Sequence, residues 1–298
     1  MKLVRFGNAG QEKPGLVGSD GGIRDLSGVL PDLAGAALSA ENLDRLRRVD
    51  PTTLPAVPAG TRLGPCVGAV RNFVAVGLNY ADHAAETGAP IPAEPILFNK
   101  APSCIVGPND DIVIPRGSQK TDWEVELVIV IGDHASYVGA NEALDYVAGY
   151  CVCNDVSERE YQIERSGQWM KGKGCPTFGP LGPWMVTKDE IPDVHNLDMW
   201  LDVNGQRMQA GSTRTMIFNV PKLVSYISHF MILEPGDVIT TGTPPGVGLG
   251  MKPPRFLKAG DNVRLGIQGL GEQNQRFVSF EEHPFDTSVR KHHAHAAA

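Results

Sequence analysis

Two glutamates stand at the start of an apolar run. In TDWEVELVIVIGD, residues 121–133, Glu124 and Glu126 lead into a run of valine, leucine and isoleucine that closes at Gly132-Asp133. Alternate side chains of a strand point to one face, so the two carboxylates lie on the same side, at a spacing where like charges repel. They form either a solvated strand edge or a pair that holds a cation.

A third carboxylate follows a second apolar run. The segment YVAGYCVCND, 146–155, is predicted to be a strand and ends in Asp155. An acid at the end of a buried strand is well placed for chemistry, because the scaffold fixes it and the chain can open there. Three converging carboxylates need a cation, and oxygen ligands favour Mg2+, Mn2+ or Ca2+ over zinc. The pattern favours a metal site without excluding the solvated edge.

A histidine and a glutamate form a possible acid–base pair. In GLNYADHAAETG, 77–88, His83 and Glu86 are three residues apart and are neighbours on a helical turn. A glutamate beside an imidazole fixes its tautomer and raises its basicity, so the pair could take a proton from water. An exposed surface helix explains the pattern equally well. The glycines at both ends would let the segment move as a lid.

The segment 157–184 carries four polar side chains that could meet a substrate: Arg159, Gln162, Lys171 and Lys173. A lysine or arginine near a metal could bind a substrate carboxylate, although a solvated basic face is the default interpretation. The many glycines and prolines predict an irregular loop that lines a site.

A glycine-rich segment, TTGTPPGVGLG at 240–250, follows the predicted strand GDVIT. It does not satisfy the dinucleotide pattern, because Met251 stands where the third glycine is required and the following KPP prevents a helix start. A nucleotide site is therefore not expected. Thr243 and the backbone amides could still contact a small anion.

The elements that must position these residues change in character along the chain. Residues 1–68 are expected to form a small N-terminal domain and linker, with strands in 2–6 and 15–27 and a helix over 38–49 capped by Ser39. Beyond it, strand-like runs recur at 72–78, 124–132, 146–155, 199–208, 236–243 and 261–269, with helices only at 141–149 and 219–231. The pattern predicts an α+β fold that is mainly β.

Composition narrows the function classes. A net charge of -7 over 298 residues disfavours nucleic acid as a partner. No apolar run reaches about 18 residues and no signal peptide is apparent, so we expect no membrane span and a cytoplasmic location. Five cysteines fit free thiols, and Cys151-Val-Cys153 is better explained by small strand residues than by zinc. The histidine-bearing tail, 284–298, is set aside.

Five motifs in order resemble the fumarylacetoacetate hydrolase family over about residues 70–282. They are N-Y-A-D-H-x-x-E (79–86), E-x-E (124–126), N-D-V-S-x-R-x-x-Q (154–162), G-K-G-x-x-T-F-x-P-L-G-P-W (172–184) and G-T-P-x-G-V-G (242–248). The resemblance implies a mixed β-roll or barrel for residues 69–283, a homodimer or dimer of dimers, and Mg2+ with Mn2+ as an alternative.

The resemblance also implies roles for individual residues. Matched by motif, Glu124, Glu126 and Asp155 correspond to metal ligands, and His83 with Glu86 to the dyad that activates water. Lys173 corresponds to a catalytic lysine that faces the substrate, whereas Lys171 has no counterpart. The substrate contacts are Arg159, Gln162 and Thr243.

The substrates implied by the resemblance are 2-oxo and 2,4-diketo acids. The downstream segments are most similar to members that hydrolyse 2,4-diketo-3-deoxy acids from rhamnonate or fuconate to pyruvate and a carboxylic acid. Alternatives at the same site are oxaloacetate decarboxylation and ureidoglycolate lyase activity. A metal- or metabolite-binding protein without catalysis is the alternative from another class.

Overall fold

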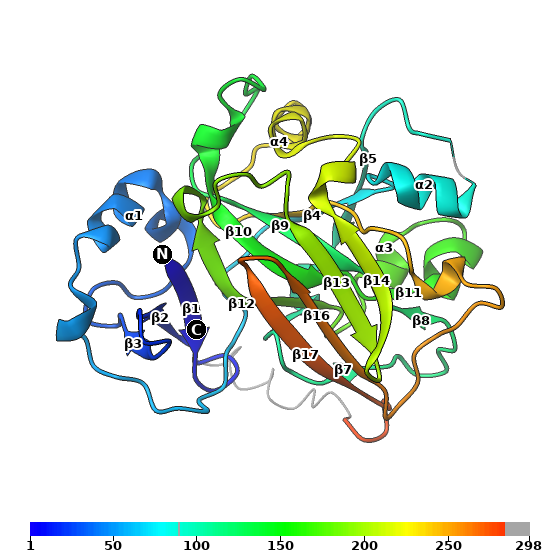
Figure 1. Cartoon of the computed structure of the whole chain (residues 1–298), viewed down its shortest axis with the longest axis horizontal. Helices are drawn as coiled ribbons and strands as arrows, with labels where there is room; N and C mark the ends of the chain where they lie inside the picture. The colour runs from blue at the N-terminus through cyan, green and yellow to red at the C-terminus, as the bar shows by residue number, and fades with distance from the viewer. Residues whose placement is uncertain (89, 284–298) are drawn as a thin grey trace, which may run out of the picture.

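The fold is mainly β, as predicted from the sequence. The structure is a computed structural model that describes residues 1–88 and 90–283, so the predicted tail lies outside the described residues. Two large sheets contain most of the strands, with few helices around them (Figure 1). Neither sheet closes into a barrel within these residues. The same residues contain no helix long and apolar enough to span a membrane.

The largest sheet has ten strands and holds the two strands that lead to the carboxylates. Its order is β3-β2-β1-β12-β10-β9-β15-β4-β5, and β6 pairs with β12. The strands are β1 (Lys2–Phe6), β2 (Lys13–Val17), β3 (Ile23–Asp25), β4 (Phe73–Gly77), β5 (Ile96–Lys100), β6 (Ile105–Val106), β9 (Val125–Ile131), β10 (Val147–Asn154), β12 (Gly179–Thr187) and β15 (Val238–Thr240).

A second sheet of five strands has the order β14-β13-β16-β17-β7. Its strands are β7 (Ile112–Val113), β13 (Asp198–Val203), β14 (Gln206–Ser212), β16 (Asn262–Ile267) and β17 (Gly271–Val278). A separate pair joins β8 (Thr121–Asp122) to β11 (Ser157–Glu158). In Figure 1 the five-stranded sheet lies in front of β9 and β10.

The N-terminal strands extend the main sheet. β1 pairs antiparallel with β12, where Lys2 lies opposite Val186, and β2 and β3 continue outward from β1. In Figure 1 these strands and α1 (Ala40–Arg47) occupy one side of the molecule, and α2 (Ala81–Thr87) lies on the opposite side.

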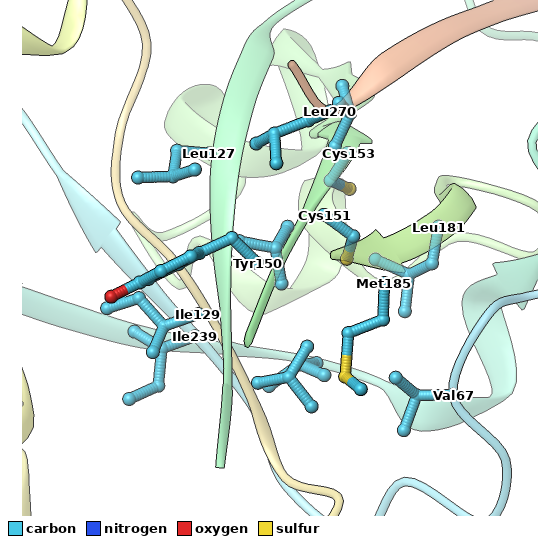
Figure 2. Close-up of a cluster of buried hydrophobic side chains, with 14 of the residues drawn as sticks. Val67, Leu127, Ile129, Tyr150, Cys151, Cys153, Leu181, Met185, Ile239 and Leu270 are labelled. Carbon is cyan, nitrogen blue, oxygen red and sulfur yellow. The ribbon is translucent and has the colours of Figure 1, made fainter. Parts of the chain in front are cut away.

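The core lies on the central strands. All residues of β9 and β10 are buried, because both faces of these strands are covered. Figure 2 shows apolar side chains from four neighbouring strands meeting there, among them Leu127, Ile129, Tyr150, Cys151, Met185 and Ile239. Cys151 and Cys153 are therefore buried strand residues, as the sequence favoured. A carboxylate on β9 is consequently inside the protein.

Two predicted helices are present. Ser39 caps α1 by accepting a hydrogen bond from the Asn42 amide at 3.3 Å, and the helix lies within the predicted range. The fourth helix, α4 (Val220–Ser228), begins after Asn219, whose side chain accepts from the Lys222 amide at 3.0 Å. Its apolar side chains pack into the core at the predicted helical spacing.

The predicted helix over 141–149 is wrong. Only a single 3-10 turn forms, over Ala143–Tyr146, and Val147 already opens β10. Val147 pairs with Ile131 and Gly149 with Val130 of β9. Pairing with a buried neighbouring strand outweighs the weak helical preference of this short segment.

Two other segments contain more structure than predicted. The run 199–208 is a hairpin of β13 and β14, and Asn204 and Gly205 both have positive φ at its turn, which is the N-G signal of a tight hairpin. The expected loop 157–184 contains β11, a π-helical turn over Glu160–Glu164, the short helix α3 (Met170–Lys173) and the start of β12.

Candidate active site

The three predicted metal-ligand carboxylates meet where β9 begins and β10 ends. The strands are antiparallel and Asn154 lies opposite Val125, so the residue after β10 lies beside the residue before β9. Two hydrogen bonds fix this junction: the Asp155 amide donates to the Glu124 carbonyl at 2.8 Å, and the Glu124 amide donates to Asn154 Oδ1 at 3.0 Å. Carboxylate oxygens of Glu124, Glu126 and Asp155 all lie within 4.8 Å of one another.

Burial rules out the solvated strand edge. Glu124 is 6% exposed, Glu126 2% and Asp155 1%. Carboxylates are almost never this buried without partners. The two glutamates therefore face a shared interior site.

Glu124 and Asp155 have cationic partners. Lys173 Nζ donates to Glu124 Oε2 at 2.6 Å and to Asp155 Oδ2 at 2.7 Å, and Arg159 donates to Glu124 Oε1 at 2.7 Å. Burial alone would raise the pKa of Glu124, but Lys173 and Arg159 outweigh it and lower the pKa to about 2. Glu124 is thus held in its ionised form.

Glu126 has a different environment. The Gly242 amide donates to Glu126 Oε2 at 2.9 Å. Burial, followed by repulsion from Asp155 and Glu124, raises the pKa of Glu126 well above its ordinary value. A cation at this point would relieve that repulsion.

The donor set fits a hard divalent cation. Glu124, Glu126 and Asp155 offer only oxygen ligands, and they are the cluster of possible metal ligands found in the described ranges. Mg2+ and Mn2+ accept such ligands and leave positions for substrate oxygens. These three residues would hold the ion.

Affinity for Mg2+ is expected to rise with pH as long as the pH is below the raised pKa of Glu126. Below the raised pKa of Glu126 its carboxyl carries a proton, and an incoming cation must expel it. The affinity for Mg2+ should therefore increase with pH up to the raised pKa of Glu126 and level off above it. Calorimetric titration with Mg2+ in two buffers of different ionisation heat measures the protons released. An affinity for Mg2+ that does not change with pH in this range contradicts the prediction.

A carboxylate that the sequence interpretation missed, Asp122, holds the site together. It is fully buried and accepts from Arg159 Nε at 2.8 Å and from the Gly248 and Leu249 amides at 2.7 and 3.0 Å. It therefore connects Arg159 to the glycine-rich segment. The signal was present, since Asp122 continues the alternation of Glu124 and Glu126 backward by two residues.

Lys100 was also missed. Its side chain is buried at the end of β5, and Nζ donates to Asp155 Oδ1 at 2.5 Å, to the Val156 carbonyl at 3.3 Å and to the Lys173 carbonyl. Burial opposes its charge, but Asp155 outweighs this and raises the pKa of Lys100. The sequence signal is a lone lysine that closes the apolar segment PILFNK.

The predicted dyad forms on α2. His83 Nδ1 lies 3.1 Å from Glu86 Oε2, as expected for residues three apart on a helix. His83 is 8% exposed, so it is not an ordinary surface histidine. The Gly246 amide donates to both Glu86 oxygens, at 3.0 and 3.2 Å, which joins the helix to the glycine-rich segment.

Gly246 cannot be replaced without disturbing this contact. It has φ +104°, and a Cβ there would lie 2.0 Å from the Met208 carbonyl oxygen. Only glycine allows the chain to pass so close to β14 while its amide faces Glu86.

The predicted substrate contacts lie in the same region. Gln162 Oε1 accepts from Arg159 at 3.0 Å. The Thr243 hydroxyl donates to the Val125 carbonyl at 2.9 Å and accepts from Gln209 at 2.8 Å. Gln209, buried on β14, is a further polar residue that the sequence did not reveal. Lys171 is exposed and donates to the Arg165 carbonyl.

One pocket of about 240 Å³ unites the site. Every residue predicted to be catalytic, substrate-binding or metal-binding lines it, except Glu86, which contacts it through His83. Its floor is the charged cluster, and part of its wall is apolar, including Phe98 and Trp169. This arrangement can bind a small anion beside a cation, with an imidazole in the lining of the same pocket.

A comparison with known protein families decides the assignment. Residues 72–278 match the family described as fumarylacetoacetate (FAA) hydrolase C-terminal. The chain belongs to the fumarylacetoacetate hydrolase family. Members of this family are enzymes, hydrolases and isomerases among them. A protein of Burkholderia orbicola (strain MC0-3), named as a hydrolase, is 64% identical over 277 residues, which are 93% of this chain and 98% of the relative.

Solved structures of the family agree with the fold. Fumarylacetoacetate hydrolase from Exiguobacterium antarcticum has a TM-score of 0.82 and 36% identity, covering 94% of this chain and 99% of that one. The maleylpyruvate hydrolase of Sphingobium sp. SYK-6, in complex with manganese(II) and pyruvate, has a TM-score of 0.77 and 28% identity over the same shares. A 2-hydroxyhepta-2,4-diene-1,7-dioate isomerase from Mycobacterium marinum has a TM-score of 0.72 and 32% identity, covering 94% and 98%.

Proposed function

We propose that this family member hydrolyses a C–C bond of a 2,4-diketo acid of the acylpyruvate type, giving pyruvate and a carboxylic acid. The observation that carries the proposal is one pocket lined by a buried carboxylate triad, two cations and the histidine of the His–Glu dyad. The Sphingobium structure supports it, because that relative is a maleylpyruvate hydrolase with manganese and pyruvate bound. A sugar-derived acyl arm, as in 2,4-diketo-3-deoxy-L-rhamnonate or fuconate, is one form of this substrate class.

The metal we propose is Mg2+, with Mn2+ as the alternative, held by Glu124, Glu126 and Asp155. When bound, the ion would supply positive charge that stabilises the oxyanion of a 2-oxo acid as the neighbouring C–C bond breaks. Lys173 and Arg159 both face this pocket and are placed to orient the carboxylate of the substrate.

His83 is proposed to act as the general base. Glu86 accepts at Nδ1 and stabilises the imidazolium that results when Nε2 takes a proton from water. The hydroxide attacks the distal carbonyl carbon, and the bond to the methylene carbon breaks. The electron pair of that bond and the proton held by His83 together convert the methylene group into the methyl group of pyruvate.

Product analysis tests this reaction. The protein is incubated with acetylpyruvate, with a sugar-derived 2,4-diketo acid and with oxaloacetate, each with and without Mg2+, and products are followed by NMR. Pyruvate and a second carboxylic acid, formed only with metal, are expected from a diketo acid. Turnover of oxaloacetate alone, with CO2 released, would instead favour the decarboxylase.

Replacing His83 by asparagine is expected to lower kcat for hydrolysis by about 10²–10⁴-fold, the usual contribution of a general base. Calorimetry should still detect binding of pyruvate, because His83 holds none of the triad oxygens. His134→Asn is the matched control, since His134 is an exposed histidine whose Nδ1 lies 3.4 Å from Glu234. Unchanged hydrolysis in His83→Asn would exclude the proposed base.

We also propose a cytoplasmic location. All five cysteines are free thiols in the structure, and four of them are buried. Free thiols are typical of a reducing compartment.

A further inference from the structure

The pocket has two chemically different parts. Its floor carries the charged side chains described above, whereas much of the remaining lining is apolar. The apolar residues include Leu78, Phe98, Ile163, Trp169, Val247 and Leu249. A 2-oxo acid whose carboxylate lies at the floor must extend its acyl arm along this apolar lining. We call that lining the arm wall.

Two aromatic rings of the arm wall are closely packed. The Phe98 and Trp169 rings pack edge to face, with centroids 5.2 Å apart. The Trp169 ring lies directly against the backbone of Gly77, where an added Cβ would be 2.5 Å from it. Ile163 and Leu249 belong to the same lining and remain 50% and 38% exposed. Exposed apolar side chains at a pocket gain most from covering by an apolar ligand.

Few polar groups are left for the arm. The Thr243 hydroxyl already donates to Val125 and accepts from Gln209, and Gln162 Oε1 accepts from Arg159. The Gln162 amide nitrogen makes no hydrogen bond within the described residues, so it is available to one carbonyl or carboxylate oxygen. An arm with several hydroxyl groups would leave most of them unpaired against the arm wall.

The charge of the floor also limits the arm. Its linked cluster contains four carboxylates and three cations, which are Asp122, Glu124, Glu126 and Asp155 with Lys100, Arg159 and Lys173. With all of them ionised, the net charge of the cluster is -1, and a bound divalent cation would change it to +1. The carboxylate of one 2-oxo acid neutralises it. The Lys173 ammonium lies 5.3 Å from the centre of the Phe98 ring, but it is already paired with Glu124 and Asp155. The arm-wall residues themselves include no lysine or arginine for a second carboxylate in the part of the chain that the structure describes.

We infer, on the basis of the proposed function, that the acyl arm of the substrate is short, apolar and uncharged. The preferred substrates are then monoanionic acylpyruvates with an alkyl or aryl arm, in contrast to polyhydroxylated sugar acids and to dioates. This preference differs from that of the relatives whose names specify maleylpyruvate or a heptadiene dioate as substrate.

Binding of stable 2-oxo acids tests the inference independently of turnover. Calorimetry with the Mg2+-loaded protein compares pyruvate, 2-oxohexanoate, 2-oxoadipate and 2-keto-3-deoxygluconate. We expect 2-oxohexanoate to bind at least about 10-fold more tightly than each of the others, because it alone covers the arm wall without an unpaired polar group. Equal or tighter binding of 2-oxoadipate or 2-keto-3-deoxygluconate, or no binding of 2-oxohexanoate, overturns the inference.

A charge introduced into the arm wall should reverse the preference. Leu249→Arg places a cation at a partly exposed position, so we expect about 10-fold tighter binding of 2-oxoadipate and weaker binding of 2-oxohexanoate. Leu144→Arg is the matched control, since Leu144 is 40% exposed and lies outside the pocket. It should change neither affinity. The same shift in both variants, or in neither, contradicts the assignment of the arm wall.

The two proposals fail in different ways. If 2-oxohexanoate binds best but no 2,4-diketo acid is hydrolysed, the apolar preference stands and the hydrolase proposal fails. If a diketo acid with a charged or polyhydroxylated arm is hydrolysed with the highest kcat/KM, the hydrolase stands and the apolar arm is overturned.

Discussion

Replacing Lys100 by methionine is expected to lower the free energy of unfolding by about 3–5 kcal/mol, the cost of removing one partner from a buried ion pair. The Lys100 side chain is 1% exposed, and its ammonium donates to Asp155 and to the carbonyls of Val156 and Lys173. Methionine fills similar space but supplies no charge. Urea unfolding followed by circular dichroism measures the change.

The same substitution should lower kcat, because Lys100 fixes both a proposed metal ligand and the backbone of a proposed substrate contact. Lys120→Met is the control, since the partly exposed Lys120 pairs with exposed Glu164. A surface pair of this kind contributes about 0–1 kcal/mol. If Lys100→Met lowers the free energy of unfolding by less than about 1 kcal/mol, the Lys100–Asp155 pair contributes no more than a surface pair.

Glutamine substitutions at the two glutamates are expected to have opposite effects on stability without metal. Glu124→Gln removes the partner of Arg159 and Lys173 and should lower the free energy of unfolding by about 3–5 kcal/mol. Glu126→Gln removes a carboxyl whose pKa is raised by burial and by the neighbouring Asp155 and Glu124, and should increase the free energy of unfolding at pH 7.

The increase in Glu126→Gln should depend on pH. Below about pH 4.5 the glutamate is protonated in both folded and unfolded chains, so the substitution changes little. As the pH rises, only the unfolded chain ionises readily, and the wild-type protein loses stability relative to the variant. Urea unfolding in EDTA at several pH values measures this difference.

Both variants should nevertheless bind Mg2+ at least about 100-fold more weakly, since residues that only orient a ligand already contribute about 10–100-fold. Calorimetry with Mg2+ tests this. Glu272→Gln is the control, because exposed Glu272 pairs with Arg264 on the surface. Equal stability changes at Glu124 and Glu126 would contradict the charge distribution of the site.

Much of the fold could be predicted because the central strands are continuous apolar runs. β9 and β10 lie where the sequence indicates, and their acidic ends could be identified from spacing alone. The segment 141–149 could not be assigned correctly. Its last residues form a strand because they pair with β9, and the local sequence gives no information about that pairing. The five-stranded sheet likewise depends on long-range pairing.

The site was only partly visible in the sequence for a similar reason. Glu124, Glu126 and Asp155 stand in recognisable patterns, and the structure brings them together. Lys100 stands in no motif, and Asp122 is indicated only by its spacing from Glu124. The importance of both comes from partners distant in the chain. Lys100 lies 55 positions from Asp155, so no local pattern could join them.

The separation of the charged floor from the arm wall has an evolutionary consequence. Asp122 and Lys100, which support the charged floor from behind, each have several partners, so nearly every change there damages the whole cluster. Ile163 and Leu249 are partly exposed and their side chains are not part of that cluster. After gene duplication, the copies can therefore diverge in substrate preference while they keep the same reaction. For the same reason, a saturation library limited to positions 163 and 249 samples new substrates with little risk to the catalytic residues.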